Sequence, residues 1–80
     1  MVHRFQKRFF VLNNEVLAYY KKDGGVIIER GLISLKLAKI DPKTKTDLNM
    51  LINTGTMLIH LKFNTIEEKW DWYYAILECQ

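Results

Sequence analysis

Basic side chains near the N-terminus are the residues of this sequence best suited to bind a ligand. Residues 1–22 carry five basic side chains against one acidic one, whereas residues 64–80 carry four acidic side chains against one lysine. The five basic residues are Arg4, Lys7, Arg8, Lys21 and Lys22. Guanidinium and ammonium groups form charge-assisted hydrogen bonds with phosphate. This sidedness fits attraction of one end of the chain to an anionic surface, and it also fits a face that is merely solvated.

Catalytic and metal-binding chemistry find no support in the sequence. His3 and His60 lie far apart, Cys79 is the only cysteine, and no acidic cluster has the spacing of metal ligands. There is no glycine-rich phosphate loop and no serine nucleophile motif. We therefore expect no enzymatic activity, no cofactor and no metal site.

The same composition favours a cytoplasmic protein that spans no membrane. A single cysteine cannot form an intrachain disulfide, so nothing indicates an oxidising compartment. The longest stretch without charge, residues 48–61, is interrupted by asparagine, threonine and glycine and falls short of the roughly 18 to 20 apolar residues that a span needs. The N-terminus has no apolar segment of the secretory type.

The elements that must position the basic residues are mostly strands. Residues 7–12 and 16–21 are β-branched and aromatic runs separated by a short turn, which predicts a hairpin. We expect a loop at residues 21–25 (KKDGG), a third strand over 31–40, and a second hairpin built from 47–53 and 56–63. Because side chains alternate along a strand, Arg8 and Phe10 share a face, as do Tyr19 and Lys21, so Arg8 and Tyr19 should meet at the open end of the first hairpin.

A terminal helix follows the strands. Thr65 and Glu68 form a capping box, and the next residues contain neither glycine nor proline. The helix has two apolar stripes: Trp72, Ala75 and Ile76, preceded by the stem of Lys69; and Ile66, Trp70, Tyr73, Tyr74 and Leu77. We expect Trp72 and Ile76 to fix the helix to the sheet, and the second stripe to be either tucked into the core or a contact surface.

These elements predict a mainly β (α+β) protein with a partly open antiparallel barrel or sandwich, capped by a C-terminal α-helix. Their order and their amino-acid sequences resemble those of a pleckstrin-homology (PH) domain. The resemblance is carried by FQKRFFVL (residues 5–12), LAYYKK (17–22), ERGLISL (29–35) and EEKWDWYYAI (67–76), in which Trp72 takes the place of the family's near-invariant tryptophan. It covers nearly the whole chain, which we therefore expect to be a single domain over residues 1–80.

The resemblance also implies a missing element. A PH sheet has seven strands, and only six residues precede Lys7, so we expect the domain to be incomplete at its N-terminus, without the first strand. A fragment, a split domain and an alternative start each account for this. The strand that holds Phe9 and Val11 would then have an exposed edge, which is an aggregation hazard or a docking site.

In the PH family, the members that bind phosphoinositides surround the headgroup with basic residues. Carried over to this chain, the resemblance implies that Arg8, Tyr19 and Arg30 contact the phosphates, and that Gln6 stands where binders have a basic residue. The first-strand lysine has no counterpart, so the pocket is incomplete. Arg4, Lys7, Lys21 and Lys22 would add general attraction to anionic lipid, at about 1 kcal/mol each. Lys7 has the opposite parity from Arg8 and should face outward.

These residues are compatible with two functions. The first is a membrane-targeting adaptor that binds anionic phospholipids, phosphoinositides in particular, as a peripheral protein at the inner face of membranes and as part of a larger host protein. The second is a protein-interaction module of the same fold without specific lipid binding. A nucleic-acid binder would suit the interleaved basic and aromatic residues, but the helix stands at the very end and the net charge is only +3, so we expect no nucleic-acid partner.

Overall fold

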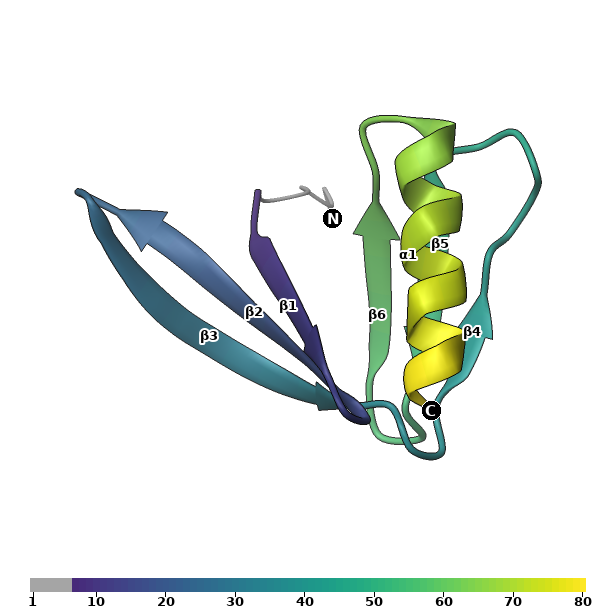
Figure 1. The fold of residues 1–80 in the computed structure, drawn as a ribbon, viewed down its shortest axis with the longest axis horizontal. Coiled ribbons are helices and arrows are strands. Elements are labelled where there is room, and N and C mark those ends of the chain that lie inside the picture. Colours follow the sequence, from purple (N-terminus) through teal and green to yellow (C-terminus); the bar gives the residue numbers. More distant parts are fainter. Residues whose placement is uncertain (1–6) are drawn as a thin grey trace.

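The computed structural model describes residues 7–80, which form two three-stranded antiparallel sheets and one helix. The first sheet has the order β1-β2-β3 and the second the order β4-β5-β6, as Figure 1 shows. The elements are β1 (Phe9–Asn13), β2 (Val16–Asp23), β3 (Val26–Ser34), β4 (Lys39–Asp41), β5 (Asn49–Asn53), β6 (Leu58–Lys62) and α1 (Ile66–Cys79). This is the mainly β sandwich capped by a C-terminal helix that the sequence predicts.

The first hairpin has the predicted parity. Phe10 lies opposite Tyr19 and Leu12 opposite Leu17, and these four side chains belong to the core or pack against it. The intervening residues of β1, Phe9 and Val11, are exposed on the other face. Period-two alternation therefore gave the inward face of both strands correctly.

The strand predicted over residues 31–40 is wrong, because the chain changes sheets within it. β3 ends at Ser34, a turn closes where the Ala38 N–H donates to the Leu35 carbonyl at 3.2 Å, and β4 begins at Lys39. Leu37 would share a face with Ile33 and Leu35 in one continuous strand, but it is 86% exposed on this turn. The alternating pattern continues across the turn, so periodicity alone cannot reveal the break.

The loop predicted over residues 21–25 is also too long. Gly24 and Gly25 have φ angles of 55° and 84° and form a two-residue turn between β2 and β3. Two consecutive positive φ angles match the twist of an antiparallel pair, so the flanking residues continue to pair, from Asp23 with Val26 onward. The hairpin therefore projects from the rest of the molecule (Figure 1).

The core lies between the two sheets and the helix. Six side chains at most 2% exposed form it: Leu17, Ile33, Leu35, Met50, Ile52 and Ile76. Trp72 is half-buried, and its ring meets the edge of Phe10 at a centroid distance of 6.4 Å. The predicted stripe of Trp72 and Ile76 is thus the face of α1 that packs on the sheets.

Hydrogen bonds close the sandwich at the C-terminal end of α1. The Glu15 N–H donates to the Cys79 carbonyl at 3.0 Å, and the Gln80 side chain donates to the Leu35 and Ala38 carbonyls at 2.8 and 2.7 Å. At the opposite end, Thr65 caps the helix by accepting the Glu68 N–H at 3.1 Å, as predicted. One end of the sandwich is therefore tied shut by backbone and side-chain bonds.

A buried lysine holds the β4–β5 connection against the helix. Lys69 is 0% exposed, and its ammonium donates to the Thr44 carbonyl (2.7 Å), the Asp47 carbonyl (3.0 Å) and the Asp47 carboxylate (2.9 Å). Three N–H donors thus meet three acceptors, which compensates for the loss of hydration. Lys69, together with the Asn49 N–H, holds the pKa of the Asp47 carboxyl well below its usual range.

We predict that the buried stripe of α1 carries most of its contribution to stability. Ile76→Ala and Trp72→Ala should each lower the free energy of unfolding by about 3 kcal/mol, because they leave a cavity in the core. Tyr74→Ala, on the exposed side, should cost less than about 0.5 kcal/mol in dilute protein. Urea denaturation provides the measurement. A larger loss for Tyr74→Ala than for Trp72→Ala would mean that the helix docks by its other face.

We predict that the Asp47–Lys69 pair makes the fold sensitive to acid. The pKa of Asp47 is lower in the folded chain, so its contribution to stability is complete above about pH 4 and is lost as the pH falls from there toward the folded pKa. Asp47→Asn should be less stable than wild type at pH 7, and the difference in the free energy of unfolding should shrink steadily as the pH falls below about 4 in urea titrations. Glu78→Gln, which removes an exposed carboxyl of α1, is the control. A gap that stays constant with pH contradicts the prediction.

Candidate functional site

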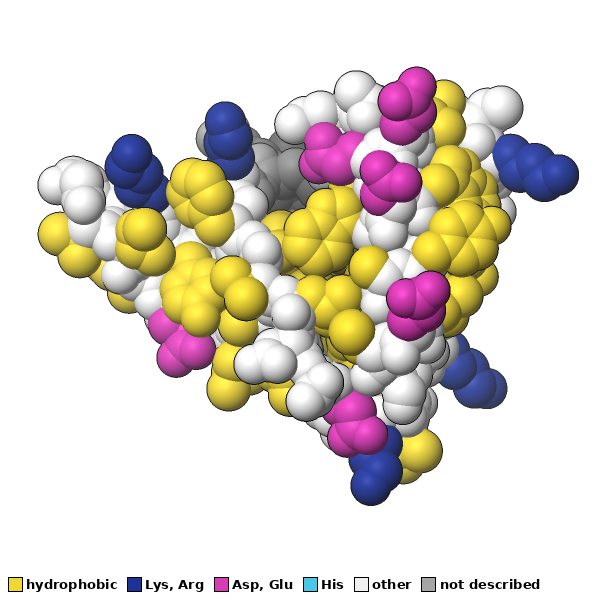
Figure 2. Space-filling view, in the orientation of Figure 1, with side chains coloured by type: hydrophobic (Ala, Val, Ile, Leu, Met, Phe, Trp, Pro, Cys, Tyr) yellow, Lys and Arg dark blue, Asp and Glu magenta, His cyan; other side chains and the backbone are white. Residues whose placement is uncertain are grey.

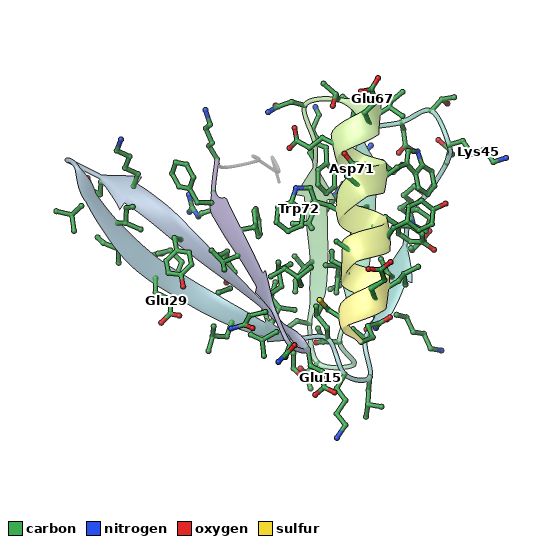
Figure 3. All side chains as sticks on the ribbon, in the orientation of Figure 1. Glu15, Glu29, Lys45, Glu67, Asp71 and Trp72 are labelled. Atoms are coloured by element: carbon green, nitrogen blue, oxygen red, sulfur yellow. The ribbon has the colours of Figure 1, made fainter. Side chains whose placement is uncertain are left out.

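A groove separates the two sheets at the end of the molecule that is not tied shut. It is a cavity of about 660 Å³ bordered by β1, β6 and α1. Leu17 and Ile33 form its floor, and Trp72 points from α1 into the space beside β1 (Figure 3). The groove therefore reaches from solvent to the hydrophobic core.

Two of the predicted ligand residues meet in this groove. Arg8 is half-buried, lines the groove, and donates from Nη1 to the Lys7 carbonyl at 2.9 Å. Tyr19 lines the same groove, with its ring 6.2 Å from that of Phe10. The resemblance had paired these two residues, and strand parity had placed them together.

A third predicted ligand residue, Arg30, is not brought to the groove. Arg30 is exposed and lies at a β-bulge, where the β2–β3 register shifts between Tyr19 and Tyr20, and it does not border the groove. A bulge redirects side chains, so the parity of an ideal strand does not apply there. Gln6, like the surface residue Arg4, lies outside the described residues.

The position of Tyr19 depends on Gly31, its partner in the β2–β3 pair. A Cβ on Gly31 would lie 2.6 Å from the Tyr19 hydroxyl oxygen and 2.7 Å from Cζ. The ring therefore lies flat across the glycine, and any larger residue would displace it. Gly31, which the sequence suggested only as part of a strand motif, is what fixes the tyrosine hydroxyl.

The surface lysines are spread over different faces. Lys21 is half-buried and shares the parity of Tyr19, whereas Lys22 has the opposite parity and is exposed; neither borders the groove. Lys7, predicted to face outward, lines the groove instead. It precedes Phe9, the first paired residue of β1, so strand alternation does not fix its direction.

Sequence reasoning missed the residues that the second sheet and the helix contribute. Lys62, His60 and Asn64 line the groove from β6 and its end, and Glu68 lines it from α1. The His60 ring nitrogen lies 3.0 Å from the Asn49 side-chain oxygen. Alternation along residues 56–63 could have grouped His60 with Lys62, but no local signal shows that β6 faces β1 across a groove.

A family model for the PH domain matches residues 2–80 of the chain. The chain belongs to the PH domain family. No solved structure shows a significant match. PH domains typically serve as non-catalytic modules that bind lipids or proteins, so this chain is a binding module of that general kind.

Two further findings bear on the site of this PH domain. Between residues 7 and 80, no helix has both the length and the apolar character needed to cross a membrane. Over the same residues, no three His, Cys, Asp or Glu side chains come close enough to hold a metal ion. The absence of a first strand concerns residues that precede the described ones, so it stays a prediction.

We predict that Gly31→Ala disturbs the groove through Tyr19. The added methyl group must push the ring aside, so stability should fall by about 1 to 3 kcal/mol, as for overpacking. In the Tyr19→Ala background the same substitution should cost clearly less, and this double-mutant cycle isolates the contact. Urea unfolding of the four proteins is the measurement. Equal costs in both backgrounds would show that Tyr19 does not rest on Gly31.

Proposed function

We propose that this PH domain is a membrane-targeting adaptor that binds anionic phospholipid headgroups, phosphoinositides in particular, at the rim of the groove. The observation that carries the proposal is that Lys7 and Arg8, which precede β1, and Lys62, which ends β6 in the other sheet, border one groove. Among the described residues, three basic side chains stand there against one acidic residue, Glu68. The chain would act as a peripheral protein on the cytoplasmic face of membranes, within a larger host protein.

The chemistry of the rim suits a phosphorylated headgroup. A guanidinium such as that of Arg8 can form paired hydrogen bonds to phosphate, and lysine ammonium groups add point charges. Tyr19 lines the same groove, and its hydroxyl is a group that can donate to a phosphate oxygen. The apolar floor below excludes water and lowers the local dielectric constant, which strengthens each of these interactions.

The affinity should be modest and largely electrostatic. Arg30 stands away from the groove, and the resemblance implies that Gln6 has an amide where phosphoinositide binders carry a basic residue. Lys21 and Lys22 then act by general attraction to an anionic surface, which salt screens over about 8 Å at physiological ionic strength.

A protein partner is the second candidate, and the position of β1 in the first sheet favours it. Among residues 7–80, β1 is an outer strand of its sheet and pairs with β2. Phe9 and Phe10 of this strand line the groove. An extended peptide could add to β1 and place alternate side chains in the groove, as in strand-addition complexes.

Sedimentation with lipid vesicles tests the primary proposal. Phosphatidylcholine vesicles that contain phosphatidylserine, or phosphatidylinositol bisphosphate, should bind the chain at low salt and release most of it at physiological salt. Arg8→Ala and Lys62→Ala should each weaken binding by about fivefold, the effect of about 1 kcal/mol per charge.

The double change of Lys21 and Lys22 to alanine is the matched control for charge away from the groove. If it weakens binding as much as the combination of Arg8→Ala with Lys62→Ala, the attraction is general and the groove is not the site. Selectivity for the bisphosphate that survives physiological salt and disappears with Arg8→Ala would show a specific pocket instead of weak attraction. Absence of binding at low salt would refute lipid binding and leave the protein partner.

A further inference from the structure

Most of the second apolar stripe of α1 remains on the surface of the fold, although Tyr73 is half-buried and packs against the core. Ile66, Trp70, Tyr73 and Leu77 follow the spacing i, i+4, i+7, i+11, which is the a/d pattern of a helix that packs against another helix. Tyr74, beside this line, is 59% exposed, and Ile66 and Leu77 are also exposed. We call these five residues the seam. Two tyrosines and a tryptophan give it far more apolar surface than a solvated helix face needs.

The aromatic rings of the seam hold one another in place. Trp70 meets Tyr73 at a centroid distance of 5.3 Å and Tyr74 at 6.0 Å, and the two tyrosines lie 5.3 Å apart. The Trp70 indole N–H donates to the Lys45 carbonyl at 3.4 Å, within the connection that Lys69 secures. The rings are thus arranged before any partner arrives, which lowers the entropic cost of binding.

Opposite charges flank the seam on its two sides. Glu67, Asp71 and Glu78 are exposed and follow one another along α1 at spacings of four and seven, so they form an acidic line parallel to the seam. Lys45 lies on the other side, where it borders a small hollow with Trp70 and Tyr74. Figure 3 shows Glu67 and Asp71 on one side and Lys45 on the other, and Figure 2 shows the apolar surface between acidic and basic side chains.

We propose that the seam binds a second copy of this chain, with the two α1 helices parallel and related by a two-fold axis along their direction. Such an axis brings the acidic flank of each copy opposite the basic flank of the other. Because Lys45 and Asp71 both lie beside Trp70, they stand at the same height along the helix and can face each other across the interface. An antiparallel pair would instead place acidic flank against acidic flank.

The flanking charges also favour a copy of the chain over a lipid surface. The acidic line would meet anionic headgroups with like charge, whereas a partner that presents both signs satisfies both flanks. The buried area is that of a few aromatic and aliphatic side chains in each copy, so we expect a weak dimer, with a dissociation constant of about 10 to 100 μM. Trp72 and the groove lie on a different side of α1 from the seam, so dimerisation does not cover the groove.

Sedimentation equilibrium of the full chain over a concentration series tests the proposal. Wild type should pass from monomer to dimer, and Tyr74→Ala should weaken the dimer at least tenfold, because Tyr74 is the most exposed aromatic residue of the seam and tyrosines often dominate interface energies. Leu37→Ala, which removes an even more exposed apolar side chain outside the seam, should leave the dissociation constant unchanged. A chain that stays monomeric up to about ten times the expected dissociation constant, or a dimer insensitive to Tyr74→Ala, would overturn the proposal.

Charge reversal then tests the parallel arrangement. Lys45→Glu makes both flanks acidic and Asp71→Lys makes the acidic flank partly basic, so each variant alone should dimerise less than wild type. An equimolar mixture of the two variants should form heterodimers in preference to either homodimer, because opposite flanks then meet. Native mass spectrometry distinguishes the species if one variant carries ¹⁵N. A statistical mixture, or no recovery of dimer on mixing, would rule out this pairing of flanks.

Discussion

The ammonium of Lys69 is the point at which the helix, the β4–β5 connection and the second sheet are joined. With no exposed surface and three oxygen acceptors, it needs the connection to fold over it, and the connection in turn has its carbonyls satisfied by the lysine. This contact sets the rotation of α1 about its axis. Once Lys69 faces the core, Ile76 enters it and Trp72 turns toward the groove, while Trp70 and Tyr74 are left beside Lys45 on the surface.

Local chemistry made much of the fold predictable. The helix start at Thr65 follows from a hydroxyl that accepts an N–H, and the face of each first-hairpin strand follows from alternation. The break at residues 35–38 could not be found in this way, because it arises from the move between sheets and the apolar pattern continues through it. Lys69 was visible only as a stem on an apolar stripe, since its partners are 22 and 25 residues away.

The groove was even harder to predict from local sequence patterns than the fold. Arg8 and Tyr19 could be paired from the sequence because one hairpin holds both. Lys62 and Glu68 could not, because their approach to Arg8 depends on how two separate sheets and a helix pack. Hydrogen bonds from Glu15 and Gln80 tie one end of this packing, and the groove lies at the other end.

The shielding of Lys69 has a consequence for amine chemistry. Acylating reagents attack an accessible, unprotonated nitrogen, and this one has every N–H committed to an oxygen inside the fold. Its reaction must therefore wait for the helix and the connection to separate, whereas exposed lysines react at once. The rate at which Lys69 alone becomes acylated would then measure how often this part of the domain opens, a quantity separate from the global free energy of unfolding.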